Sequence, residues 1–105
     1  MATNFSVTYT LAVTDDLATT QRLAMSRFIG GRIINRTYGG ITLTVYESDE
    51  PMGTYALCST VGTNGALAAM DEDEAFVLPT ELSASAWIKF VGNVAGTVDV
   101  VLKGN

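Results

Sequence analysis

Hydrophobic and polar residues alternate along the first part of the chain. Over residues 5–13 every odd-numbered residue is large and hydrophobic, whereas the even-numbered ones are serine, threonine or alanine. Side chains of a strand point alternately to its two faces, so this pattern predicts a strand with one buried face. The next residues, Thr14, Asp15 and Asp16, have a composition typical of a turn.

Residues 17–36 allow two interpretations. The segment 21–28 has fair helix propensity, and Asp15 is placed to cap such a helix. The same segment also alternates between hydrophobic and polar residues, and the pair Gly30 and Gly31 that follows would weaken a helix. We therefore expect two strands in this region.

The remainder of the chain predicts further short strands separated by turns. Strands are expected at residues 41–47, 54–59, 75–78, 87–91 and 97–103, where β-branched and aromatic residues alternate with polar ones. Glycine, proline and asparagine mark the turns at 38–40, 47–53 and 61–65, and a hairpin turn is expected at 92–96. Residues 66–70 fit a weak strand or a short helical stretch, and residues 79–84 fit a single helical turn.

The number and spacing of these segments predict the fold class. Short strands with a turn every 8–12 residues or so are typical of a β-sandwich or a small barrel. We expect an all-β, single-domain β-sandwich or jelly-roll-like fold of about seven to nine short antiparallel strands over residues 1–105. The length leaves no room for a second core. Residues 1–4 are expected to form a flexible N-terminal arm.

Composition excludes most catalytic chemistry. The chain has no histidine, so Ser-His-Asp and Cys-His pairs and imidazole metal sites are excluded. Its single cysteine, Cys58, cannot form an intrachain disulfide, and its position in a predicted strand favours a small buried hydrophobic role. We expect a binding or structural module with no catalytic residues, no cofactor and no metal site, rather than an enzyme.

Charge is distributed unevenly along the chain. The net charge of −5 argues against a nucleic-acid partner. Four arginines against two aspartates give residues 1–40 a charge of +2, whereas nine acids against two lysines give residues 41–105 a charge of −7. The candidate partner-docking residues are therefore the four arginines, Arg22, Arg27, Arg32 and Arg36. The alternative is that they are solvated surface residues paired with the chain's own acids.

Two further groups of residues invite a functional interpretation. The run Asp71–Glu74 has the hard oxygen ligands that calcium prefers, but it lacks the spaced ligands and the turn glycine of a calcium loop. A solvated acidic loop is the favoured interpretation. The aromatic residues Trp87, Tyr46, Tyr55 and Tyr38 would suit a sugar-stacking platform. Because Trp87 lies in an apolar strand, we instead expect it in the core, together with either Phe90 or Ile88.

The N-terminus shows no secretory signal, and no apolar run is long enough to cross a bilayer. We therefore expect a protein made in a cytoplasm that has no membrane partner.

One pattern links several of these segments. A strand runs into a Ser/Asp-rich loop at Val45 to Asp49, an apolar-Pro-x-x-Leu segment follows at Leu78 to Leu82, and a Trp-Ile-Lys-Phe strand lies at Trp87 to Phe90. Over about half of the chain this pattern resembles small β-sandwich virion proteins of tailed bacteriophages. The resemblance implies a capsid decoration (cement) protein, a type that commonly forms trimers on the capsid surface.

The sequence therefore predicts a structural virion protein that binds the head surface and stabilises the shell by bridging capsid subunits. Its expected partners are the major capsid protein or another virion protein, and further copies of itself in a homotrimer. Its expected location is the capsid surface, after assembly in the host cytoplasm. Two alternatives stay open: a carbohydrate-binding or adhesin β-sandwich module, and a phage tail or connector component.

Overall fold

Eight antiparallel strands and one short helix make up the part of the chain that the computed structural model describes, residues 5–59 and 61–104. The strands are β1 (Phe5–Val13), β2 (Arg22–Ala24), β3 (Phe28–Asn35), β4 (Leu43–Ser48), β5 (Ala56–Leu57), β6 (Ala75–Val77), β7 (Trp87–Gly92) and β8 (Gly96–Gly104), and the 3-10 helix η1 covers Thr80–Ala84. The arm predicted at residues 1–4 lies outside the described residues.

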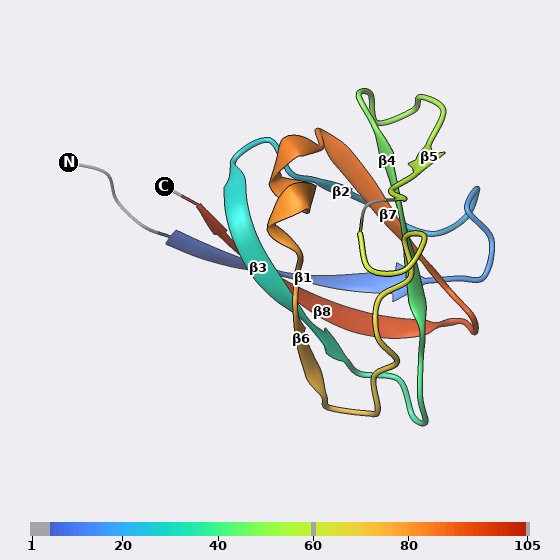
Figure 1. Ribbon diagram of the computed structural model, residues 1–105. Coiled ribbons are helices and arrows are strands. Elements are labelled where there is room, and N and C mark those ends of the chain that lie inside the picture. The colour runs from blue at the N-terminus through green and yellow to red at the C-terminus, as the bar shows by residue number, and fades with distance from the viewer. Residues whose placement is uncertain (1–4, 60, 105) are drawn as a thin grey trace.

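The strands form two four-stranded sheets (Figure 1). Sheet A has the order β1-β8-β3-β6 and sheet B the order β2-β7-β4-β5. Each of the first four strands pairs with its counterpart counted from the other end of the chain: β1 with β8, β2 with β7, β3 with β6 and β4 with β5. This is the strand order of a jelly roll, in which one long hairpin is rolled into two sheets. The predicted all-β sandwich is confirmed.

The longest ladder among the described strands joins β1 and β8, and in β1 hydrophobic and polar residues alternate. β1 pairs with β8 over nine residues without a register shift, from Phe5 opposite Gly104 to Val13 opposite Gly96. Leu11 and Val13 of β1 and the alternate β8 residues Val98, Val100 and Leu102 are buried, while the threonines of β1 are exposed. The strand and its buried face are therefore as predicted, and this ladder fixes one wall of the core.

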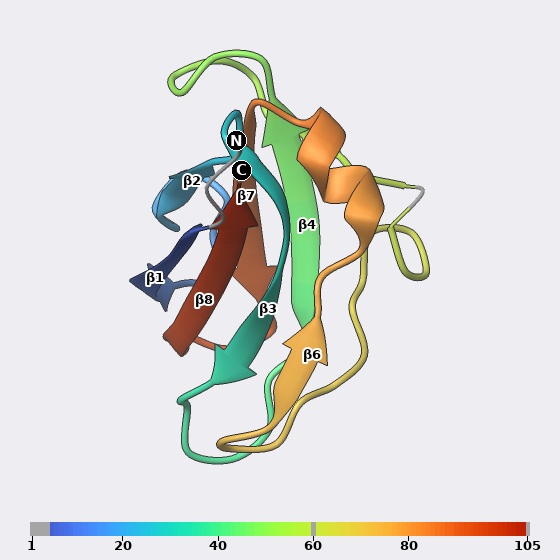
Figure 2. The same ribbon diagram turned by 90° about the vertical axis from the view of Figure 1, so that its left-hand side faces the viewer.

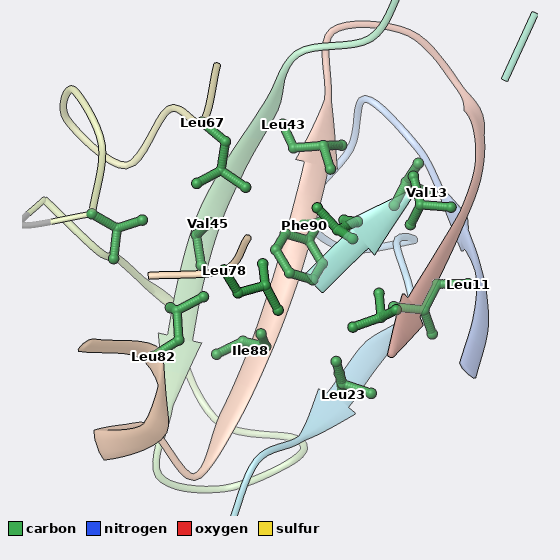
Figure 3. Packing of buried hydrophobic residues seen from close by; sticks show 14 of the residues in the cluster. Leu11, Val13, Leu23, Leu43, Val45, Leu67, Leu78, Leu82, Ile88 and Phe90 are labelled. Carbon is green, nitrogen blue, oxygen red and sulfur yellow. The ribbon is translucent and has the colours of Figure 1, made fainter. Parts of the chain in front are cut away.

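The core fills the space between the sheets (Figure 3). The Phe90 ring lies at its centre, with Leu43 and Val45 of β4 on one side and side chains of β1 beyond it. Leu78 and Leu82, from the segment between β6 and β7, are buried against this cluster. Figure 2 shows η1 beside the upper part of β4, on the opposite side of the molecule from β1, so this segment closes one side of the sandwich.

The region 17–36 forms two strands, β2 and β3, and not a helix. Elsewhere the ladders are shorter than predicted. Only Ala56–Leu57 of the segment 54–59 forms a strand, and residues 66–70 make isolated bridges, Ala66 with Thr44 and Met70 with Ile41. The predicted helical turn at 79–84 is confirmed as η1.

The hairpin predicted at residues 92–96 is wrong. The strands on either side, β7 and β8, belong to different sheets, so the link crosses the sandwich. The Gly92 N–H donates to the Thr14 carbonyl and the Asn93 N–H to the Thr42 carbonyl, at 2.9 and 3.0 Å. A Gly-Asn turn composition is common to hairpins and to cross-sheet links, so it could not separate the two.

Candidate functional site

A hollow of about 640 Å³ opens on the outer face of sheet B. We call it the sheet-B hollow. Strands β2 and β7 form its floor, and two loops form its rim. Its lining residues are Ala18, Thr19, Thr20, Gln21, Arg22, Pro51, Met52, Gly53, Tyr55, Trp87 and Lys89. The volume lies within the range of about 300–1,000 Å³ found for small-molecule sites.

Trp87 lines this hollow, and its predicted place in the core is wrong. Along β7 the fully buried residues are Ile88 and Phe90, so both candidate partners of the indole lie in the core. Trp87 and Lys89 share the other, outward face and are half-buried. The physical reason is the phase of the strand: a lysine ammonium cannot be buried unpaired, so Lys89 points outward, and every second residue follows it.

Two cations face each other on the floor of the hollow. Arg22 of β2 lies directly opposite Lys89 of β7, an arrangement that destabilises a sheet by like-charge repulsion. The Arg22 guanidinium carbon lies 5.8 Å from the centre of the Trp87 ring, and the Lys89 ammonium nitrogen 4.7 Å from the centre of the Tyr55 ring. Cation–π attraction offsets part of the repulsion. Such local conflicts are expected mainly at functional sites.

The first rim loop, residues 18–21, is held by hydrogen bonds to the strands. The buried Thr20 hydroxyl donates to the Phe90 carbonyl oxygen at 2.7 Å. The Gln21 side-chain oxygen accepts a hydrogen bond from the Ala12 N–H at 2.6 Å. Gln21 thereby also covers one end of the open edge of β1. This side of the hollow is therefore preformed.

The second rim loop places a tyrosine and a methionine. The Tyr55 hydroxyl donates to the Pro51 carbonyl oxygen at 2.9 Å. Burial raises the pKa of the Tyr55 phenol, and the nearby Arg22 charge partly opposes this shift. Met52 is 82% exposed and its sulfur lies 3.4 Å from an Arg22 guanidinium nitrogen, so the rim is apolar beside the cation.

The other tyrosines lie outside the hollow. Tyr46 of β4 lies beside Lys89 on the outer face of sheet B, with Leu57 of β5 on its other side. Tyr38 is 92% exposed in the link between β3 and β4. The structure thus brings together Trp87 and Tyr55 of the four proposed stacking residues.

The four candidate docking arginines are spread over different faces. Arg22 points outward from sheet B, whereas Arg32 lies on the outer face of sheet A, opposite Val101. Arg27 follows β2 and its guanidinium lies 5.4 Å from the centre of the Phe5 ring. Each arginine is therefore a separate candidate for docking, and a single four-arginine face is not formed.

Arg36 is engaged within the chain. It forms ion pairs with Asp73 at 2.6 Å and with Asp99 at 2.9 Å, and Asp99 also accepts a hydrogen bond from the Thr10 hydroxyl. The Arg36 hydrogen bond, followed by that of Thr10, lowers the pKa of the Asp99 carboxyl. This pairing with the chain's own acids is the alternative that the sequence left open for the arginines.

The acidic run Asp71–Glu74 is exposed throughout, as a solvated loop would be. Among the side chains that the structure describes within residues 5–59 and 61–104, no group of three acidic or cysteine residues comes close enough to hold a metal ion. Nor does this part of the chain contain a helix that is long and apolar enough to cross a membrane.

Cys58 is buried, as predicted, and its thiol is held by a carboxylate. The Cys58 sulfur donates to Glu47 Oε2 at 3.1 Å, and the Ser85 hydroxyl donates to the same oxygen at 3.0 Å. Burial, and then the hydrogen bond to Glu47, raise the pKa of the Cys58 thiol to about 12. Because the thiolate is the reactive form, this arrangement makes the cysteine inert and links β4 to the segment before β7.

We expect the Cys58 thiol to react with a disulfide reagent at least a hundredfold or so more slowly in the native protein than in denaturant, because so little thiolate is present at about pH 8. The rate of colour release in buffer and in guanidinium chloride measures this difference. The variant Glu47→Gln, which removes the carboxylate, should react faster than the parent. Equal rates in the native and unfolded parent would contradict the buried, carboxylate-held thiol.

The hollow contains residues that the sequence analysis did not single out. Lys89 and Met52 were not proposed, whereas Trp87 and Tyr55 were named together only as an alternative that the sequence did not favour. The lysine in the middle of the Trp-Ile-Lys-Phe strand was the available signal, since it sets which side chains face outward. No comparable signal marks Met52, which reaches the hollow through the loop that follows β4.

Comparison of the chain with models of protein families, with curated proteins and with solved structures finds no match.

Proposed function

We propose that this chain is a structural protein of a tailed-bacteriophage virion, a capsid decoration protein that acts by binding. The jelly-roll strand order carries the proposal, because eight-stranded jelly rolls recur among viral capsid proteins. The resemblance of residues 45–49, 78–82 and 87–90 to small phage sandwich proteins supports it. In this role the protein bridges neighbouring capsid subunits as a homotrimer on the head surface, after assembly in the host cytoplasm.

The β1 edge of sheet A supports association with other chains. β1 is nine residues long, lies at the edge of its sheet and contains no charged residue and no proline. Gln21 pairs with the backbone of Ala12 at one end. By the alternation of a strand, the backbone groups of Ser6, Thr8 and Thr10 point to the same open side. Long uncharged edges are where a second chain adds by strand pairing.

The outer face of sheet A offers a docking surface beside this edge. A shallow depression of about 480 Å³ is lined by Ser6, Gly31, Arg32, Val77, Val101 and Lys103. Val77 is 77% exposed, so apolar contact is available next to the two cations. An acidic and apolar patch on a capsid subunit would complement it, and Arg32 is the candidate docking arginine on this face.

Sedimentation with purified phage heads tests the proposal. The protein should pellet with expanded heads and should have the mass of a trimer in solution. The double variant Arg32→Gln with Lys103→Gln should reduce the bound fraction severalfold, whereas Arg22→Gln with Lys89→Gln, a matched change on sheet B, should not. A monomer that stays in the supernatant would contradict the proposal, and pelleting with isolated tails instead of heads would favour a tail or connector component.

A carbohydrate-binding function is the second candidate, and one observation favours it. The half-buried Trp87 indole and the Tyr55 ring lie together in the sheet-B hollow, where aromatic faces can stack on a sugar ring. Jelly rolls also include lectin domains. This function would make the protein an adhesin-like module, which is compatible with a place on the virion surface.

A further inference from the structure

The charge of the sheet-B hollow is opposite to that of the chain. The whole chain carries −5, with 11 acids against 6 bases. The residues that line the hollow include Arg22 and Lys89 and no aspartate or glutamate. Within the described residues both ion pairs are formed by Arg36, and neither Arg22 nor Lys89 forms one. The residues that line the hollow therefore carry a net positive charge on an acidic protein.

Both cations keep donors available for a ligand. One Lys89 N–H donates to the Leu17 carbonyl oxygen at 2.9 Å, which fixes the ammonium group and leaves two of its three donors. Arg22 contacts the Met52 sulfur through one nitrogen, and its distance of 5.8 Å from the Trp87 ring is near the outer limit of cation–π contact. A bound anion would also relieve the repulsion between the two facing cations.

The surroundings of the two cations favour a carboxylate over a phosphate. The planar guanidinium can form two parallel hydrogen bonds with either anion. Phosphate groups are typically bound by helix N-termini and by nests of backbone N–H groups. The hollow has no helix at its lining, and its floor is made of strands. The indole and the phenol beside the cations supply apolar faces for a ring.

We infer that the sheet-B hollow binds a sugar that carries a carboxylate, such as a uronic or sialic acid. This inference rests on the second candidate function and adds the charge of its ligand. The carboxylate lies between Arg22 and Lys89, and the sugar ring packs against Trp87 and Tyr55. The rim loops are already held by hydrogen bonds, so little ordering is needed on binding.

Trp87 is the only tryptophan of the chain, so its fluorescence reports on the hollow directly. The test titrates the protein with two matched pairs of sugars: sialyllactose against lactose, and trigalacturonate against its methyl ester. The acidic member of at least one pair should change the Trp87 emission saturably and bind at least about tenfold more tightly than its neutral partner. Binding should weaken as salt is added.

Variants separate the hollow from the rest of the surface. Arg22→Gln and Lys89→Gln should each weaken binding of the acidic sugar about tenfold. Arg32→Gln, which removes an equal charge from the outer face of sheet A, should leave it unchanged. Thermal melts of all three establish that they are folded, and calorimetric titration provides a readout independent of the indole.

The outcomes distinguish the inference from the function on which it rests. Equal affinity for the acidic and neutral members would overturn charge selection and leave carbohydrate binding in place. Absence of binding by both pairs in calorimetry as well as fluorescence would overturn both. Tighter binding of a nucleotide such as AMP than of any acidic sugar would overturn the sugar assignment and make the hollow a phosphate site.

Discussion

Replacing Asn35 with alanine should lower the free energy of unfolding by about 3 kcal/mol, since buried polar groups would lose their partners. Asn35 is fully buried at the end of β3. Its side-chain nitrogen donates to the carbonyl oxygens of Met70 and Gly39 at 3.1 and 3.3 Å, and its side-chain oxygen accepts from the Thr37 N–H at 2.9 Å. The one side chain thus holds the link after β3 against the segment before β6.

Urea unfolding of the Asn35→Ala variant measures this loss. Asn93→Ala is the matched control, because Asn93 is exposed and its side chain accepts one hydrogen bond, from the Thr42 N–H. The control should cost about 1 kcal/mol or less. A loss at Asn35 no larger than the loss at Asn93 would show that the buried amide does not hold the two links together.

The second large effect is expected at Phe90, the ring at the centre of the core. Phe90→Ala should destabilise the protein by about 3–5 kcal/mol, because it removes apolar contacts and leaves a cavity between the sheets. Phe90 is fully buried, and it lies opposite Val45 in sheet B. A small domain has only about 5–15 kcal/mol of stability in total, so this variant should lose a large share of it and unfold at a much lower urea concentration than the parent.

Two further variants serve as comparisons for the loss of stability in Phe90→Ala. Phe90→Leu keeps most of the apolar volume and should cost less than half as much as the alanine change. Val91→Ala alters the next residue of β7, which points outward and is half-buried, and should cost about 1 kcal/mol or less. Equal midpoints for Phe90→Ala and Val91→Ala in urea would contradict the assignment of inner and outer faces in β7.

Local alternation was sufficient to predict most of the strands. In β1 the phase is unambiguous, since large hydrophobic residues and small polar ones alternate without interruption over the whole strand. β8 has the same inward phase, with Val98, Val100 and Leu102 buried, although Val101 interrupts the alternation on its outer side. The seven to nine strands expected from the turn spacing agree with the eight observed. A strand with one buried face shows alternating hydrophobic and polar residues, so it can be predicted from residues that are close together in the sequence.

The phase of β7 was assigned wrongly because side-chain size was weighted over charge. Trp87, Ile88 and Phe90 are all large and apolar, so size alone does not say which of them is buried. In a strand, Trp87 shares the face of Lys89, and Ile88 and Phe90 share the opposite face. The cost of burying an unpaired ammonium exceeds the gain from burying one indole, so Lys89 decides the phase. The indole was then left on the surface, where it became part of the hollow.

The hollow itself could not be read from local patterns. It is formed by β2, by β7 and by the loop that follows β4. These segments are separated by tens of residues along the chain. Their proximity follows from the rolled pairing of β2 with β7 and of β4 with β7. Turn composition does not specify which strands pair across a sandwich, as the cross-sheet link at residues 92–96 demonstrates. The opposed cations became visible only once the register was known.

The two outer faces of the sandwich have separate roles in the proposals. In the proposed function, sheet A is the side that docks to a capsid, through the open β1 edge and the cations beside Val77. In the further inference, sheet B is the side that binds a small ligand, through the aromatic rings and the facing cations. A decoration protein that is held by one face and presents the other would use both, and the reciprocal charge variants on Arg32 and Arg22 separate them.

Quenching of Trp87 fluorescence by iodide and by caesium tests the outward, cation-flanked position of the indole most directly. Iodide should quench the native protein severalfold more strongly than caesium, because Arg22 and Lys89 attract the anion and repel the cation. The difference should shrink in the Arg22→Gln with Lys89→Gln variant. Protection of Trp87 from both ions, as for a tryptophan in the core, would contradict the account.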